Sequence, residues 1–231
     1  MKTIGLLGGM SWESTALYYR LINEGVKQRL GGLHSARIAL VSVDFHEIEQ
    51  MQHSGDWEAA GVALAHAAQQ VEAAGADFLL ICTNTMHKLA PQIEASIGIP
   101  LLHLADATAR TILDAGLTTV GLLGTAYTME QEFYRGRLVE HGLTVLVPPA
   151  QDRAIVHRVI YDELVVGEVR ESSRAEYVRI IDDLATRGAE GVIEGCTEIG
   201  MLLQQRDTLV QLFDTTVLHA NAAVETALAQ S

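Results

Sequence analysis

The feature of this 231-residue chain that most limits how it can fold is an internal repeat. Ile4-Gly-Leu-Leu-Gly8 recurs as Val120-Gly-Leu-Leu-Gly124, 116 residues later. Three further matches follow in the same order, and their offsets shrink to 108 residues: Tyr19-Arg20 with Tyr134-Arg135, Gly75-Ala-Asp77 with Gly188-Ala-Glu190, and Leu104 to Thr108 with Leu212 to Thr216. Ordered, shrinking offsets are what two diverged copies with small deletions leave. The sequence therefore predicts two similar halves.

Within each half, short apolar runs alternate with longer amphipathic stretches. This alternation predicts an α/β fold in which each domain is a mainly parallel sheet flanked by helices. The runs expected as strands are Thr3 to Leu7, Ile38 to Val43, Phe78 to Ile81, Leu101 to Leu104, Val120 to Leu123, Leu143 to Val147, Gly191 to Ile193 and Val210 to Phe213. The stretches expected as helices include Ser14 to Gln28, Trp57 to Ala74, Met86 to Ser96 and Thr215 to Gln230.

The repeat also predicts the domain boundaries. If Leu101 to Leu104 leads from the first half into the second, the equivalent Val210 to Phe213 leads the last helix back to the first. We therefore expect residues 1–100 plus 215–231 to form one domain and residues 101–214 the other. Ligands of such folds bind beyond the carboxyl ends of the strands, so the active site is expected in the interdomain cleft.

Charge and composition narrow the class of partner. The net charge of −13 would repel phosphate backbones and anionic lipids, and the basic residues are not clustered, so we expect no nucleic-acid partner. No stretch approaches the roughly 18 to 20 apolar residues of a membrane span, and the N-terminus lacks the pattern of a signal peptide. With only two cysteines, a disulfide framework is excluded. A cytoplasmic location is the expectation.

Two polar tetrads carry the candidate chemistry. When the halves are aligned at the third match, Cys82-Thr83-Asn84-Thr85 lies opposite Gly195-Cys196-Thr197-Glu198. Each tetrad follows an apolar strand and begins a helix-compatible stretch, where backbone N–H groups can hold a carboxylate and lower the pKa of a thiol. Thr83 thus faces Cys196 across the pseudo-symmetry. One polar group on each side of a bound molecule is the geometry that stereoinversion needs.

Three motifs resemble those of the aspartate/glutamate racemase superfamily. They are Gly8-Gly-Met-Ser-Trp-Glu-Ser-Thr15, Asn84-Thr-Met-His87, which resembles the family's Cys-Asn-Thr-x-His motif without its cysteine, and Gly195-Cys-Thr-Glu-Ile199. The resemblance covers essentially the whole chain. It implies an amino-acid racemase with two pseudo-symmetric α/β domains that needs neither pyridoxal phosphate nor a metal ion. It also implies a cysteine on each face of the substrate Cα, the cysteine of the second half serving the L face.

The chain departs from this pattern at its first cysteine. The position that matches it is Thr83, and Cys82 falls one residue early. Successive side chains of a strand point to opposite faces, so we expect Cys82 in the core. A threonine hydroxyl is no general base at neutral pH, although it can donate or relay a proton. We therefore expect unequal faces, with Cys196 as the thiol base and Thr83 opposite it.

The resemblance further implies a substrate-binding set, whose members share a place near strand ends. It comprises Met10, Ser11, Asp44, Asn84, Thr85, Thr125, Thr128, Thr197 and Glu198. Helix capping is an alternative role for Ser11, Asp44, Thr125 and Thr128. Glu198 is expected either to bind the substrate ammonium or to cap its helix. His87 is expected to orient the loop or to titrate near the site.

The substrate side chain is less well determined. Relatives specific for aspartate commonly carry a Lys after the position of Tyr161 and an Arg after the position of Asp44, whereas residues 162–167 hold no basic residue and residues 45–49 offer only His46. A buried carboxylate without a partner is costly. Aspartate or glutamate is the first expectation, and a neutral polar amino acid is the alternative. The sequence leaves the oligomeric state open, with a homodimer among the outcomes.

Two other functions fit the same residues. One thiol facing a residue that is not cysteine suits a decarboxylase or isomerase that delivers a proton to one face only. A two-domain cleft also suits a non-catalytic protein that binds or senses amino acids. A cysteine hydrolase is disfavoured because no His with an Asn or Asp is identifiable as a partner of Cys196.

Overall fold

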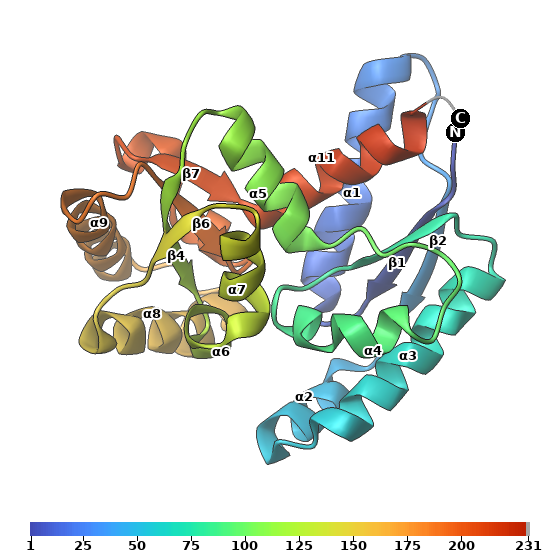
Figure 1. Cartoon of the computed structure of the whole chain (residues 1–231), viewed down its shortest axis with the longest axis horizontal. Coiled ribbons are helices and arrows are strands. Elements are labelled where there is room, and N and C mark those ends of the chain that lie inside the picture. The colour runs from blue at the N-terminus through green and yellow to red at the C-terminus, as the bar shows by residue number, and fades with distance from the viewer. Residues whose placement is uncertain (230–231) are drawn as a thin grey trace. The chain divides into compact units, whose positions relative to one another are not determined.

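The chain folds into two compact units in a computed structural model that describes residues 1–229 (Figure 1). The first unit contains Met1–Leu104 and the C-terminal segment from His219, and the second is Ala105–Leu218. The end of the expected last helix at Gln230, and Ser231 of the expected first domain, lie outside the described residues. No helix within residues 1–229 is long and apolar enough to cross a membrane.

The first unit is built on a parallel sheet of three strands in the order β2-β1-β3. These are β1 (Ile4–Gly8), β2 (Ile38–Ser42) and β3 (Phe78–Ile81). The expected strand from Leu101 to Leu104 is wrong in extent. Only Leu101 forms a parallel bridge, to Leu79, and the helix α5 (Leu104–Asp114) begins at the end of that run. A strand of this length cannot form where the chain already turns into a helix.

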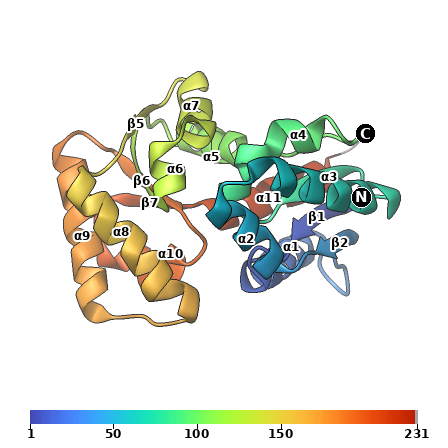
Figure 2. The same cartoon turned by 90° about the horizontal axis from the view of Figure 1, so that it is seen from below.

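Helices cover both faces of this sheet (Figures 1 and 2). Ile4, Leu6, Phe78 and Leu80 pack against α1 (Trp12–Leu30) and the end of α11 (Thr215–Leu228). Leu7, Leu79 and Ile81 pack on the other side against α2 (Phe45–Ser54), α3 (Trp57–Ala73), the 3-10 turn η1 (Thr85–Leu89) and α4 (Ala90–Glu94). The fully apolar strands are thus buried on both faces, as the α/β prediction requires.

The second unit repeats the plan. Its parallel sheet has the order β5-β4-β6-β7, formed by β5 (Thr144–Leu146), β4 (Thr119–Gly124), β6 (Gly191–Gly195) and β7 (Gln211–Asp214). The helices of this unit include α5, α6 (Ala126–Glu130), α7 (Glu132–Glu140), α8 (Ala150–Asp162), α9 (Glu171–Thr186) and α10 (Ile199–Leu202), with 3-10 turns η2 (Leu164–Val166) and η3 (Gln205–Asp207). The prediction of two similar α/β halves is confirmed.

The structure corrects the last of the four repeat matches. β3 pairs with Leu101 through Leu79, and β6 pairs with Leu212 through Val192. Leu101 is therefore the counterpart of Leu212, whereas the sequence match aligned Leu104 with Leu212. The helices that follow, α5 and α11, begin at Leu104 and Thr215. The sequence match aligned the wrong residues because both stretches share Leu, Asp and Thr at the same spacing. The first stretch lies within α5, whereas the second spans the junction between β7 and α11.

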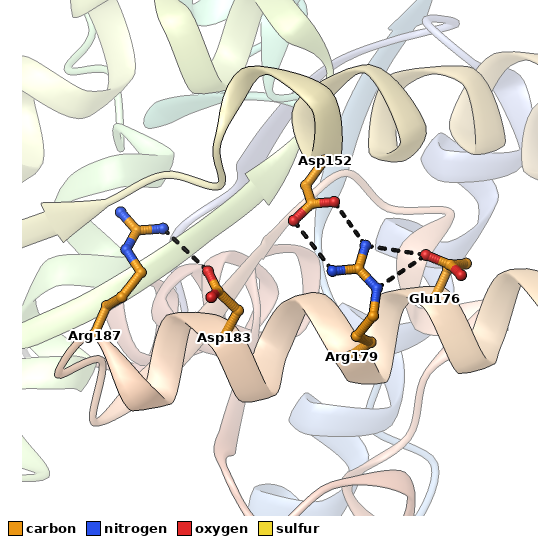
Figure 3. Close-up of polar contacts among 5 residues, drawn as sticks. All are labelled: Asp152, Glu176, Arg179, Asp183 and Arg187. Atoms are coloured by element: carbon orange, nitrogen blue, oxygen red, sulfur yellow. Dashed lines mark hydrogen bonds and ion pairs between the residues drawn. The ribbon is translucent and has the colours of Figure 1, made fainter.

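An arginine fork joins two surface helices of the second unit. Arg179 of α9 donates to both carboxylate oxygens of Asp152 on α8, at 2.6 and 3.3 Å (Figure 3). The same guanidinium also donates to Glu176 one turn earlier in α9, at 3.0 and 3.1 Å. Two-pronged contact fixes geometry better than a single ion pair does. Because Arg179 is half exposed, the fork sets the register of the two helices more than it stabilises them.

A buried glutamate lies within the second sheet. Glu194 of β6 is only 4% exposed and pairs in register with Asp214 of β7. Its Oε1 atom has no hydrogen-bond partner among the described residues. Burial, and then the carboxylate of Asp214, raise the pKa of Glu194 to about 8. Glu194 is therefore protonated in the folded chain at neutral pH.

The raised pKa of Glu194 predicts a stability that falls as pH rises. Between the ordinary carboxyl pKa and about 8, the unfolded chain gives up this proton while the folded chain keeps it, so the free energy of unfolding falls through that window by at most about 1.4 kcal/mol per pH unit. We expect Glu194→Gln to remove this slope. Urea unfolding at pH 5, 6.5 and 8 measures it, with a growing advantage of the variant over the parent.

Glu190→Gln is the matched control. Glu190 is exposed, and hydrogen bonds from the amides of Thr118 and Thr119 lower its pKa. Its contribution is complete above the ordinary carboxyl pKa, so its loss should give the same offset at all three pH values. Parallel curves for Glu194→Gln and the parent would contradict the protonated state of Glu194.

Candidate active site

Cys82 and Thr83 follow β3 directly and differ in their exposure to solvent. Cys82 is fully buried among the side chains beneath α1 and α11, whereas Thr83 is half-buried. Burial raises the pKa of the Cys82 thiol far above its ordinary range. The amide of Cys82 still donates to Leu7 of β1 at 2.9 Å, so the alternation of the strand continues to this point. The prediction that Cys82 belongs to the core is confirmed.

The residues after Thr83 form a compact turn. Asn84 is buried and precedes η1, which begins at the half-buried Thr85. His87, also in this turn, is 1% exposed, and its Nδ1 lies 2.7 Å from the carbonyl oxygen of Thr83. Of the two roles expected for His87, this contact supports that of orienting the loop.

The glycine motif brings the start of α1 close to the end of β1. A Cβ atom on Gly8 would clash with Cγ2 of Thr15, and Gly9 has a φ of 94°, so both positions require glycine. The Thr15 hydroxyl accepts from the amide of Gly9 at 2.8 Å. Ser11 caps α1 by accepting from the amide of Ser14 at 3.2 Å. The side chain of Met10 is only 4% exposed and packs in the core.

Asp44 and Thr125 are helix caps as well. Asp44 is exposed and accepts from the amide of His46 at 3.0 Å, at the start of α2. Thr125 lies at the carboxyl end of β4 and accepts from the amide of Thr128 at 3.4 Å, at the start of α6. Thr128 is fully buried, and its hydroxyl lies 3.3 Å from that of Thr125. Capping accounts for these residues, and their contact with a substrate stays a prediction.

The end of β6 forms the second polar cluster. The thiol of the half-buried Cys196 donates to Oε2 of Glu198 at 2.9 Å. Glu198 precedes α10 but makes no capping bond with its side chain, so the expected capping role is wrong. Thr197 lies beside them, with its hydroxyl 3.4 Å from that of Thr216. A thiol and a carboxylate are thus in direct contact at a strand end.

This contact corrects the expected acidity of Cys196. The strand end was expected to lower the pKa of the thiol through a helix N-terminus. Instead, burial raises the pKa of Cys196 well above its ordinary range, and the negative charge of Glu198 raises it further. α10 has four residues and begins only at Ile199, so its amides oppose the effect weakly. The proton of Cys196 rests on sulfur in this state.

The structure thus places the candidate residues in two clusters, one in each unit. Met10, Ser11, Asp44, Thr83, Asn84 and Thr85 belong to the first unit, and Thr125, Thr128, Cys196, Thr197 and Glu198 to the second. Thr83 follows the carboxyl end of β3, which adjoins the central strand β1, and Cys196 follows the carboxyl end of β6, an inner strand of the second sheet. Throughout residues 1–229, no group of three His, Cys, Asp or Glu side chains is arranged to hold a metal ion.

Sequence reasoning missed three features of these clusters. It did not find the contact of Glu198 with Cys196, although a spacing of two residues at a turn could have suggested it. It also missed Glu194, two residues before Cys196 in an otherwise apolar strand. The burial of His103 and His219 beside His87 had no local signal, because these residues come from separate segments.

Comparison with known proteins agrees with this arrangement. The family model of the Asp/Glu/hydantoin racemases matches residues 7–223. A provisionally named Asp/Glu racemase from Yersinia pestis is 56% identical, with a TM-score of 0.95 over 99% of this chain and 100% of that one. An aspartate racemase homologue from Pyrococcus horikoshii OT3 is 33% identical, with a TM-score of 0.88 over 99% of this chain and 100% of that one.

A curated relative extends the comparison. The broad specificity amino-acid racemase RacX of Bacillus subtilis (strain 168) is 20% identical to this chain, and the match covers 98% of both. The family model spans both units, including the strand ends that carry Thr83 and Cys196. The chain therefore belongs to the Asp/Glu/hydantoin racemase family.

Proposed function

We propose that this protein is an amino-acid racemase that needs no cofactor, with Cys196 as its thiol base. The observation that carries the proposal is the hydrogen bond from the Cys196 thiol to Glu198 at the carboxyl end of β6, in a chain of the racemase family. A half-buried thiol in contact with a carboxylate can pass its proton directly to that carboxylate. This pairing suits removal of a proton from carbon.

The proposed reaction begins with the proton on sulfur. Glu198 takes it from Cys196, which leaves a thiolate and a neutral carboxylic acid. The thiolate then removes the Cα proton of an L-amino acid, and the electron pair delocalises into the substrate carboxylate. General-base catalysis alone contributes about 10² to 10⁴ fold, so the developing charge on the carboxylate must also be stabilised. Asn84, Thr85 and Thr197 are the proposed donors to it.

Thr83 is the proposed proton donor on the opposite face of Cα. Its hydroxyl, or a water molecule held by it, gives a proton to the carbanion and is reprotonated from solvent. Glu198 releases the proton that it took. A hydroxyl is far too weakly acidic to be ionised at neutral pH, so Thr83 can donate here but cannot readily act as base. The two directions of racemisation are therefore unequal in mechanism.

Aspartate or glutamate is the proposed substrate, with neutral polar amino acids as the competing class. The arginines nearest to the 162–167 stretch, Arg158 and Arg170, lie against the buried Glu163, at 3.4 and 3.5 Å. They are thus already paired with a carboxylate of the chain.

The direct test of the substrate is to incubate the protein with each common amino acid in deuterium oxide and to follow loss of Cα–H by NMR. A decarboxylase would instead release CO₂ from a malonate-type acid.

Substitution of the two cysteines should have different effects on Cα exchange in this assay. We expect Cys196→Ser to reduce Cα exchange by at least about 10² fold, because serine is not ionised at neutral pH. We expect Cys82→Ser to keep the exchange rate and to lower stability by about 1 to 3 kcal/mol, because it buries a hydroxyl in an apolar cluster. Loss of exchange in a folded Cys82→Ser, checked by circular dichroism, would show that the first motif is out of register.

The role of Glu198 can be measured by alkylation. A neighbouring carboxylate disfavours the thiolate, so Glu198→Gln should lower the pKa of Cys196 and move the pH midpoint of its reaction with iodoacetamide downward. Exchange at Cα should nevertheless slow, because glutamine cannot accept the thiol proton. Cys196→Ser gives the background of the alkylation assay. An unchanged midpoint would contradict the electrostatic contact, and an unchanged exchange rate would contradict the proton transfer.

The unequal faces predict unequal kinetics for the two enantiomers. L-substrate should lose its Cα proton before D-product appears, and D-substrate should show a much lower kcat. The equilibrium constant is near one, so the Haldane relation ties the two kcat/KM values together, and the asymmetry must appear in kcat and KM separately. Thr83→Cys should raise kcat from D to L, because it supplies a second thiol. A folded variant with unchanged D-side turnover would refute the assignment of Thr83.

A further inference from the structure

The segment that leaves the first unit is held by hydrogen bonds at alternate residues. The carbonyl of Pro100 accepts from the amide of Leu79 at 2.9 Å, and the amide of Leu102 donates to Leu79 at 2.8 Å. The carbonyl of Leu102 then lies 2.7 Å from Nε2 of His219, and the amide of Leu104 donates to Nε2 of His87 at 3.3 Å. The backbone of this segment is thus hydrogen-bonded first to β3 and then to the rings of two histidines.

These contacts determine the tautomer of His87. The carbonyl oxygen of Thr83 can only accept, so Nδ1 of His87 carries a hydrogen and donates to it at 2.7 Å. The amide of Leu104 can only donate, so Nε2 of His87 is unprotonated and accepts from it. His87 is therefore a neutral imidazole whose two nitrogens join the end of β3 to the first residue of α5.

The surroundings of His87 favour this neutral form. The ring of His103 packs against it with a centroid distance of 4.5 Å, and that of His219 at 5.9 Å. By the same reasoning as for His87, His219 donates from Nε2 to Leu102 and accepts at Nδ1 from the Tyr18 hydroxyl, at 2.9 Å. All four side chains are at most 2% exposed. A proton added to Nε2 of His87 would face an N–H donor among buried rings.

We propose that His87 is the positioning residue for Thr83: the Nδ1 hydrogen of its neutral ring holds the Thr83 carbonyl. This inference rests on the proposed function, in which Thr83 delivers a proton to one face of Cα. Thr83 comes two residues after the last residue of β3 and two before η1, so regular secondary structure does not fix it. The bond from His87 is the contact that limits the orientation of its backbone.

Two conservative variants separate the two bonds of His87. The amide nitrogen of asparagine occupies the position of Nδ1, so His87→Asn can still donate to Thr83 but cannot reach Leu104. The amide oxygen of glutamine occupies the position of Nε2, so His87→Gln can still accept from Leu104 but loses the donor to Thr83. His66→Gln is the matched control, because His66 is an exposed histidine on α3.

The readout is the ratio of D-product formed to Cα–H exchanged, starting from L-substrate in deuterium oxide. Exchange does not require Thr83, whereas formation of D-product does, so a variant that merely folds less well leaves the ratio unchanged. We expect His87→Gln to lower the ratio roughly three- to tenfold, the effect of one lost hydrogen bond. His87→Asn and His66→Gln should stay near the wild-type ratio.

Each other result overturns the inference in a recognisable way. An unchanged ratio in His87→Gln, or an equal loss in His87→Asn, would show that the Thr83 bond does not position the proton donor. A ¹⁵N NMR spectrum that shows the hydrogen of His87 on Nε2 would do the same without any assay of activity. Absence of Cα exchange in the wild type with every amino acid would instead refute the proposed function, and the role of His87 with it.

Discussion

The burial of β1, β3, β4 and β6 on both faces is the constraint on which the rest of the molecule depends. In the first unit, the side chains of β1 and β3 alternate between two helix layers, so neither face is left for polar chemistry. Polar groups can appear only where the strands stop. Thr83 and Cys196 both lie at such ends, one in each unit. Because the strand order repeats, the end of β6 in the second unit is the counterpart of the end of β3 in the first.

Glu194 is the exception that this constraint makes costly. A carboxyl group within β6 can remain in place only as the neutral acid, because neither sheet face supplies a counter-charge and Asp214 beside it is itself acidic. The same logic acts on Cys196, where burial and a carboxylate both keep the proton on sulfur. At neutral pH, Glu194 and Cys196 near the end of β6 therefore both carry a proton, which suits chemistry that transfers one.

Much of the fold could be predicted because the hydrophobic periodicity of each segment is a local signal and the internal repeat is a regular one. β3 lies at the residues where it is expected, and α3 differs from the expected helix only in ending one residue earlier, at Ala73. The strand expected at Leu101 to Leu104 failed because apolar runs do not distinguish a strand from the first turn of a buried helix. α2 was missed because its ten residues carry few apolar side chains and depend on the cap from Asp44. For the site, the alternation of β3 sufficed to separate Cys82 from Thr83. The acidity of Cys196 could not be predicted, because it depends on which way the side chain of Glu198 turns.

The proton that Cys196 keeps has a consequence for its survival in an oxidising environment. Peroxides attack the thiolate and hardly the thiol, so a cysteine whose pKa is raised reacts slowly with them. Many enzymes that depend on a permanently ionised cysteine pay for it with ready conversion to sulfenic acid. In this chain, burial and then the carboxylate of Glu198 favour the less reactive thiol form of Cys196, and Cys82 is fully buried. Slow reaction of Cys196 with peroxides is therefore the expected consequence of its surroundings.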